Sequence, residues 1–162
     1  MKHKVLCTAP FKRFPKVMDH FHNTFDGLVV EYMAYEELVK RIGEFEGLIP
    51  NVRIKVNAAV LNGAKKLKAV YTPSMGYDHI DLECLKSHSV AFKGLSFDTE
   101  FSNTLWSTAE HTLSLILALL KSTVLSIQDV KKTGSWDLRK YLIKDLRYLN
   151  VGIIGLGIVG KK

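Results

Sequence analysis

Cysteine is scarce in this sequence, and the absences that accompany it exclude several classes of protein. Only Cys7 and Cys84 occur among 162 residues, with no Cys-x-x-Cys pair and no His/Cys cluster at metal-ligand spacing. A disulfide framework and a zinc site are therefore not indicated, and two buried, reduced thiols are expected. The longest apolar run, from Leu113 to Leu120 with a break at Ser114, is far shorter than the roughly 20 residues that cross a bilayer. We accordingly expect no membrane span.

A secretory signal is also missing. The start, Met1-Lys2-His3-Lys4, leads into only a short apolar run and then Lys12-Arg13, without a long apolar region or a small-residue cleavage site. A cytoplasmic protein is expected. The formal charge of +7 comes from scattered basic residues rather than from a basic stripe with a reading motif, so nucleic acid is not an expected partner.

What the sequence does contain is a repeated alternation of strand and helix patterns. With 47% hydrophobic and 24% charged residues, the composition is that of an ordinary globular protein. Short apolar runs predict strands, and amphipathic stretches between them predict helices. The predicted strands are 4–8, 28–32, 47–49, 67–71 and 90–92, and the predicted helices are 15–25, 35–42, 54–61 and 81–86. This alternation predicts an α/β fold with a doubly wound parallel sheet.

The loops at one edge of this sheet are the predicted place for chemistry. Ligands of doubly wound sheets bind beyond the carboxyl ends of the strands, which here are the loops after Thr8, Tyr71 and Phe92. The loop 72–78 carries more turn and polar residues than the other two. The segment 93–103 has no clear period and is a candidate crossing between domains.

A long apolar helix is expected after this crossing. Ser107 or Thr108 can cap it, and apolar residues then recur at four- and three-residue spacing as far as Ile127. Further apolar residues widen this stripe, so we expect the helix to be buried on more than one side, between domains or against another subunit. Gly134-Ser135-Trp136 ends the helical region.

The last stretch combines a strand pattern with a glycine-rich loop. The apolar run 151–154 predicts a buried parallel strand, and Gly155, Gly157 and Gly160 then form a Gly-x-Gly-x-x-Gly sequence. In the dinucleotide-binding motif, the first glycine makes a tight turn and the second admits the pyrophosphate. The third lets the next helix pack closely on the strand. Such a loop alone is a weak indicator of a nucleotide site.

Three separated segments together resemble one family, the NAD-dependent D-isomer-specific 2-hydroxyacid dehydrogenases. Residues 66–82 resemble its strand, substrate loop and short helix, residues 107–113 the start of its long interdomain helix, and residues 134–160 its entry into the nucleotide domain. Their order along the chain makes the resemblance specific. The segment 93–103 departs from it by lacking the Asn-Thr-Pro-like turn often found there.

The resemblance implies an organisation and a chemistry. It implies a flavodoxin-like substrate domain over 1–100, followed at 101–162 by the interdomain helix and by the first strand and glycine loop of a Rossmann domain. It also implies NAD as the cofactor, a small 2-hydroxy or 2-oxo acid as the substrate, and a homodimer of the intact protein.

The resemblance also assigns site residues. Backbone N–H groups at Met75 and Gly76 would bind the substrate carboxylate, because glycine leaves the backbone accessible, although an ordinary βα turn is the alternative. Thr108 would face the cofactor, unless it only caps its helix. The contacts to the pyrophosphate would come from the backbone of Gly155, Gly157, Ile158, Val159 and Gly160.

No catalytic residue and no metal ligand is assigned. The family moves the proton with a histidine paired with an acidic residue and polarises the carbonyl with an arginine, and all three are expected beyond the glycine loop. His79, Asp78 and Asp81 are better explained as residues that cap and orient the short helix after the substrate loop.

Two functional hypotheses follow. In the first, the chain is the N-terminal portion of an oxidoreductase that transfers hydride between NAD(H) and a D-2-hydroxy acid or its 2-oxo acid, and it is inactive alone. The acidic residue that selects NAD is expected about 20 residues beyond the glycine loop, so NADP stays open. In the second, the chain is a non-catalytic interaction module that associates with an intact homologous subunit through its apolar helix.

Overall fold

The computed structural model describes residues 1–135, 137–141 and 145–162, and it divides the chain into two compact units. The first unit runs from Met1 to Ser102 and the second from Asn103 to Lys162. The substrate-binding and nucleotide-binding roles expected of the two parts of the chain stay predictions.

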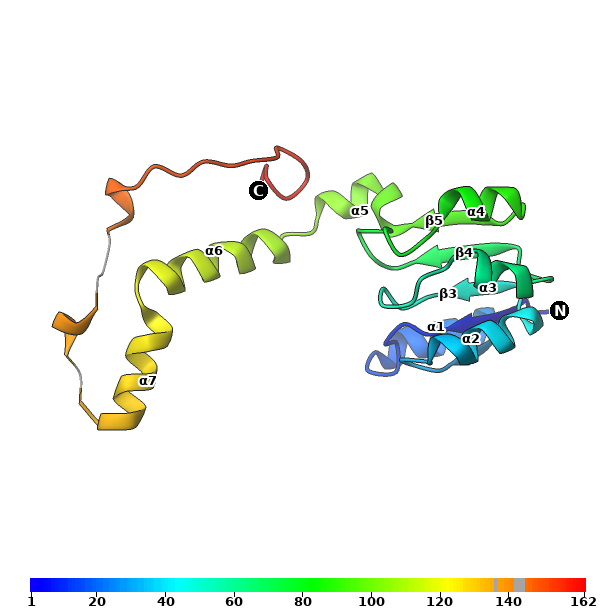
Figure 1. The fold of residues 1–162 in the computed structure, drawn as a ribbon, viewed down its shortest axis with the longest axis horizontal. Coiled ribbons are helices and arrows are strands. Elements are labelled where there is room, and N and C mark those ends of the chain that lie inside the picture. Colours follow the sequence, from blue (N-terminus) through cyan, green and yellow to red (C-terminus); the bar gives the residue numbers. More distant parts are fainter. Residues whose placement is uncertain (136, 142–144) are drawn as a thin grey trace. The chain divides into compact units, whose positions relative to one another are not determined.

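The first unit is built on a five-stranded parallel sheet (Figure 1). The order across the sheet is β2-β1-β3-β4-β5, and every neighbouring pair is parallel. This is the strand order of the flavodoxin-like doubly wound fold, which confirms the predicted fold class. The strands are β1 (Lys4–Cys7), β2 (Asp26–Val29), β3 (Gly47–Ile49), β4 (Ala69–Thr72) and β5 (Ala91–Gly94).

Helices cover both faces of this sheet. In Figure 1, α2, α3 and α4 lie in front of the sheet and α1 lies behind it. The short turn η1 precedes β3, and the turn η2 and α5 follow β5 along the chain. The helices of this unit are α1 (Pro15–Thr24), α2 (Tyr35–Arg41), η1 (Ile42–Glu44), α3 (Ala58–Gly63), α4 (Leu82–Ser87), η2 (Leu95–Phe97) and α5 (Thr99–Asn103).

The core is divided between the two faces because successive strand residues point in opposite directions. Leu6 of β1 belongs to the larger cluster, under α2, α3 and α4. Its neighbours Val5 and Cys7 belong to a smaller cluster with Phe21 of α1. Burial raises the pKa of the Cys7 thiol to about 11, so this cysteine is an inert, reduced thiol, as predicted. Cys84 is free but only partly buried, so the prediction of two buried thiols is correct for Cys7 alone.

The second strand and the third helix begin at residues other than those predicted. The sequence predicts the strand at 28–32, but it starts at Asp26, because Asp26 and Gly27 pair with Lys4 and Val5 of β1. The helix predicted from residue 54 begins only at Ala58, after Asn57 has capped it by accepting from the Val60 N–H. The first shift follows from pairing with another strand, which the local pattern does not contain, and the second from the Asn57 cap, which the apolar pattern alone does not show.

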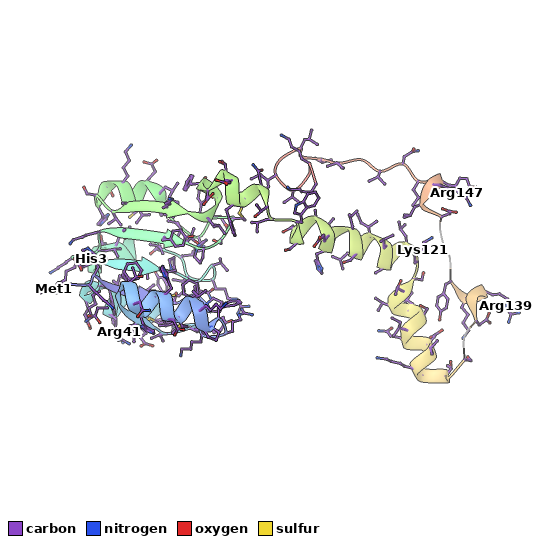
Figure 2. All side chains as sticks on the ribbon, turned by 180° about the vertical axis from the view of Figure 1, so that it is seen from behind. Met1, His3, Arg41, Lys121, Arg139 and Arg147 are labelled. Carbon is purple, nitrogen blue, oxygen red and sulfur yellow. The ribbon has the colours of Figure 1, made fainter. Side chains whose placement is uncertain are left out.

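The second unit opens with two helices where the sequence predicts one. α6 (Ser107–Leu120) and α7 (Thr123–Thr133) are separated at Ser122, whose φ of 51° ends the helical path. Lys121 marks this break in Figure 2. α7 ends at Gly134, as predicted, while Trp136 lies outside the described residues. The 3-10 turns η3 (Leu138–Lys140) and η4 (Leu146–Tyr148) follow.

The start of α6 differs from the prediction in its capping. Trp106 is the residue that precedes the helix, and it provides no side-chain cap. Ser107 and Thr108 are instead the first two helical residues, so neither is the predicted cap. The predicted capping by a hydroxyl is wrong because the helix begins one residue earlier than that role requires.

Both helices expose large apolar side chains. No residue of α6 or α7 is buried within the described part of the chain. The exposed members of this surface, called here the α6–α7 apolar surface, are Leu113, Leu115, Ile116, Leu117 and Leu119 of α6 and Val124, Leu125, Ile127 and Val130 of α7. An area of this kind is available to a partner.

The strand predicted at 151–154 is not formed. These residues are exposed, and no described segment of the chain pairs with them. A parallel strand takes its hydrogen bonds from neighbouring strands, so an apolar run does not make a strand by itself. The prediction of a strand over 151–154 is therefore wrong.

No single helix in the described residues is both long and apolar enough to cross a membrane. One bent pair, Thr99–Leu120 with Thr123–Thr133, reaches the required length and composition when its two parts are taken together.

Glu46, just before β3, has a carboxylate that is surrounded by hydrogen-bond donors. Its carboxylate accepts from Lys68 Nζ at 2.6 Å, lies 3.0 Å from His3 Nδ1 and accepts from the backbone N–H of Lys4 at 3.3 Å. The bonds with Lys68 and His3 lower the pKa of Glu46 from 4.5 to about 2. Because the pKa is lower in the folded state, this stabilisation is complete above about pH 4.5 and is lost as the pH falls towards 2.

We therefore expect stability to decrease below about pH 5, with part of the decrease due to Glu46. Glu46→Gln should flatten this part of the profile, measured as the urea midpoint by circular dichroism from about pH 6 to about pH 2.5. Glu44→Gln, which removes only an exposed ion pair with Lys4, is the matched control. Identical profiles for Glu46→Gln and the unchanged chain would exclude Glu46 as the responsible group.

Candidate functional site

The loop that follows β4 is held at its far end by backbone hydrogen bonds to Val56. The Val56 N–H donates to the His79 carbonyl at 2.8 Å, and the Val56 carbonyl accepts from the Asp81 N–H at 2.9 Å. Asp81 then caps α4, with its side chain accepting from the Cys84 N–H at 2.9 Å. This capping confirms the role predicted for Asp81, and it fixes the point at which the loop ends and α4 begins.

Met75 and Gly76, the predicted carboxylate-binding residues, lie at the middle of this loop. Among the described residues, neither backbone N–H donates a hydrogen bond. The Met75 sulfur accepts from the Ser102 hydroxyl at 3.7 Å, and a Cβ on Gly76 would stand 3.3 Å from Asp78 Oδ1. The loop therefore presents two unused donors in succession, and a side chain on Gly76 would be in tight contact with the Asp78 carboxylate.

His79 contacts the beginning of the same loop. Its ring is buried, and Nε2 lies 3.2 Å from the Thr72 hydroxyl. That hydroxyl is 2.6 Å from the hydroxyl of Ser74, which donates to the Gly76 carbonyl at 2.7 Å. Burial lowers the pKa of His79, with Asp78 acting in the opposite sense, so the neutral ring is favoured at pH 7. The His79 ring thus stabilises the loop through Thr72, whereas the sequence predicts that His79 caps and orients α4.

A hollow of about 590 Å³ opens beside this loop at the carboxyl edge of the sheet. Pro73 and Ser74 line it together with the loops after β1 and β3. Asn51 and Arg53 are polar members of its wall, and Arg53 brings a positive charge. The Asn51 N–H donates to the buried Thr8 hydroxyl at 2.8 Å, which ties the β3 loop to the end of β1.

Asn51 and Arg53 are site residues that were not predicted from the sequence. The predicted places for chemistry are the loops after the first, fourth and fifth strands, and the loop after the third strand is not among them. The signal that could have found them is their position in the loop after Ile49, at the carboxyl end of β3 in the middle of the sheet.

The glycine loop closes on itself. Gly155 has a φ of +96°, the conformation that glycine adopts readily and that a tight turn requires. A Cβ on Gly160 would overlap the Gly155 carbonyl oxygen, so the third glycine permits close packing against the first rather than of a helix on a strand. Among the described residues, the N–H groups of Gly157, Ile158, Val159 and Gly160 donate no hydrogen bond. Such a row of free donors fits the binding of a phosphate group.

The residue just before α6 contacts the end of the described chain. The Lys162 ammonium stands 4.3 Å from the centre of the Trp106 ring and donates to the Asn103 carbonyl. Trp106 directly precedes α6, in which Thr108 is the second residue and is exposed. No direct contact joins Thr108 to Gly155–Gly160 in the described residues. The substrate loop belongs to the first unit, and the glycine loop and Thr108 belong to the second.

A metal centre has no candidate among the described residues, since no group of three His, Cys, Asp or Glu side chains is placed to hold an ion.

Comparison with protein families identifies one family that matches most of the chain. Residues 5–146 match the D-isomer specific 2-hydroxyacid dehydrogenase catalytic domain. The chain belongs to this family of 2-hydroxyacid dehydrogenases. The resemblance drawn from the three sequence segments is confirmed.

Individual 2-hydroxyacid dehydrogenases and related proteins are similar over most of this chain. D-3-phosphoglycerate dehydrogenase of Archaeoglobus fulgidus is 31% identical over 97% of the chain, which covers 28% of that protein. Glyoxylate/hydroxypyruvate reductase B of Serratia proteamaculans is 29% identical over 90% of the chain, which covers 43% of it. The chain thus spans less than half the length of these two relatives.

Solved structures agree with the fold. The TT0316 protein of Thermus thermophilus matches 98% of the chain with a TM-score of 0.78 and 27% identity. D-lactate dehydrogenase of Aquifex aeolicus, solved with NAD and lactic acid, matches 98% with a TM-score of 0.73 and 25% identity. The chain covers 50% and 46% of these two structures.

Proposed function

We propose that this chain provides the substrate-binding part of an oxidoreductase that transfers hydride between NAD(H) and a small D-2-hydroxy acid or its 2-oxo acid. The observation that carries the proposal is the pair of unused N–H groups at Met75 and Gly76, in a loop at the carboxyl edge of the sheet of a 2-hydroxyacid dehydrogenase family member. A homodimer of the intact protein belongs to the same proposal.

The substrate carboxylate would be bound at this loop. Two successive N–H donors suit the two oxygens of a carboxylate, and charge-assisted bonds of this kind are stronger than bonds between neutral groups. Arg53, on the wall of the neighbouring hollow, would attract an anionic substrate and hold a second polar group. These residues bind and orient the substrate.

The cofactor would be held by the glycine loop. The free N–H groups of Gly157–Gly160 would bind its pyrophosphate, and Thr108, exposed at the start of α6, would be a further cofactor contact. When bound, the nicotinamide supplies or accepts the hydride. NADP remains an alternative to NAD, since no residue that reads the ribose is assigned.

We expect the chain alone to bind substrate without turning it over. Proton transfer needs an acid or base within reach of the reacting oxygen. His79, the histidine of the substrate loop, is buried and bonded to Thr72, so it is not placed to serve. Catalysis would then require a proton donor or acceptor other than His79.

A non-catalytic interaction module is the second candidate function. The α6–α7 apolar surface favours it, because nine large apolar side chains stay exposed on two helices. An intact homologous subunit would be the partner. Co-purification of the chain with such a subunit, and loss of that association after polar substitution of Leu119, would support this alternative.

The carboxylate site is tested by titrating the ¹⁵N-labelled chain with pyruvate. We expect the Met75 and Gly76 amide resonances to move, and we expect acetone, which has the same carbonyl but no carboxylate, to leave them in place. NADH absorbance in the same samples should not decline. Equal shifts with acetone, or shifts confined to other loops, would contradict the proposed site, and steady NADH oxidation would contradict the expected inactivity.

A further inference from the structure

The hydroxyl groups of Thr72 and Ser74 connect His79 to the Gly76 carbonyl, and counting protons fixes the direction of every bond. A carbonyl oxygen only accepts, so the Ser74 proton is used in the 2.7 Å bond to Gly76. Ser74 then accepts from Thr72 at 2.6 Å, which uses the Thr72 proton. Thr72 in turn accepts from His79 at 3.2 Å, so the proton of the neutral ring lies on Nε2.

We propose that His79 is a positioning residue for the substrate loop and acts through this one-way chain, called here the hydroxyl relay. The relay runs from His79 Nε2–H through Thr72 and Ser74 to the Gly76 carbonyl. It holds the loop through the Gly76 carbonyl and through the hydroxyl groups of Thr72 and Ser74, and it uses no backbone N–H group. Both N–H groups at Met75 and Gly76 are therefore free for a ligand. A loop held in this way keeps its donors in place before the ligand arrives.

The surroundings of the relay keep it intact. Thr72 is fully buried and His79 is 6% exposed, so water does not compete at the first bond. The His79 backbone is itself fixed by the Val56 N–H, and Thr72 is the last residue of β4. The relay thus joins the middle of the loop to two fixed points of the fold.

A first measurement needs no substrate. In ¹⁵N spectra of the histidine rings at about pH 7.5, where the ring is neutral, we expect the proton of His79 on Nε2. Ser74→Ala removes the acceptor of the Thr72 proton, so Thr72 can donate to Nε2 and the ring should move towards the Nδ1–H form. Ser74→Thr, which keeps a hydroxyl, should retain the original tautomer.

A second measurement asks whether the relay serves ligand binding. Thr72→Val replaces the hydroxyl by a methyl group of similar size and should raise the dissociation constant for pyruvate about tenfold, the factor expected for one lost hydrogen bond. Thr72→Ser should restore binding to within about twofold. A purely structural role would give both variants the same affinity once circular dichroism shows that they are folded.

This inference rests on the proposed carboxylate site. The two measurements distinguish a failure of the hydroxyl relay from a failure of the carboxylate site. A neutral His79 ring with its proton on Nδ1 in the unchanged chain, or no change of tautomer in Ser74→Ala, would overturn the relay. An Nε2–H ring in a chain that does not bind pyruvate would instead overturn the carboxylate site, and with it the positioning role of His79.

Discussion

Phe45→Ala is expected to lower the free energy of unfolding by about 3–5 kcal/mol, a large share of the stability of a small domain. The Phe45 ring is 1% exposed and lies in the main core cluster of the first unit, on the segment that enters β3. Lys4 Nζ also stands 5.1 Å from the ring centre. Alanine would leave a cavity between the sheet and α2, because a close-packed core relaxes only in part.

Urea unfolding followed by circular dichroism measures this loss. Phe14→Ala is the matched control, since Phe14 is 51% exposed and its removal should cost less than about 1 kcal/mol. The two variants lose the same side chain, so the difference between them isolates burial. A similar midpoint for both would mean that the sheet of the first unit is not packed as described.

Much of the first unit could be predicted because its strands carry their own signal. A buried parallel strand is a short apolar run, and β1, β3 and β5 were each located to within a few residues. The start of β2 could not be found in this way. Glycine is a residue type that usually interrupts a strand. Gly27 nevertheless belongs to β2, because it pairs with Val5 and the Phe21 ring packs against it.

The candidate site was predictable in place but not in detail. Doubly wound sheets bind ligands at their carboxyl edge, so strand positions gave three candidate loops, and the family resemblance then singled out the one with Met75 and Gly76. The hydroxyl relay could not, because the burial of His79 and the rotamers that join Thr72 to Ser74 are set by packing. The bond between Asn51 and Thr8, which shapes the hollow, likewise joins residues far apart in the chain.

In the second unit, the local sequence pattern predicted the secondary structure less well. The apolar residues of 107–127 predict one helix, but Ser122 adopts a left-handed conformation and divides it. The run 151–154 has the composition of a strand and forms none, because strands depend on partners while helices bond within themselves. Local pattern therefore predicted helical structure here better than it predicted strand structure.

Self-association of the chain through the α6–α7 apolar surface is the second large effect expected. Leu115 and Leu119 are 58% and 80% exposed, and burying a leucine side chain stabilises an interface by about 1.5–3 kcal/mol. The chain should therefore elute as a dimer or larger species at micromolar concentration. The double variant Leu115→Lys/Leu119→Lys should be a monomer, because both ammonium groups would have to be desolvated at the interface.

Light scattering after size-exclusion chromatography gives the mass directly. Thr112→Lys/Ser114→Lys adds the same two charges to exposed positions of α6 but removes no apolar side chain, so it should stay associated to a greater extent than the leucine variant. Equal dissociation of both variants would assign the effect to charge rather than to apolar area. An unchanged chain that runs as an 18.3 kDa monomer at all concentrations would remove self-association and would weaken the proposed interaction role, since the same apolar surface serves both.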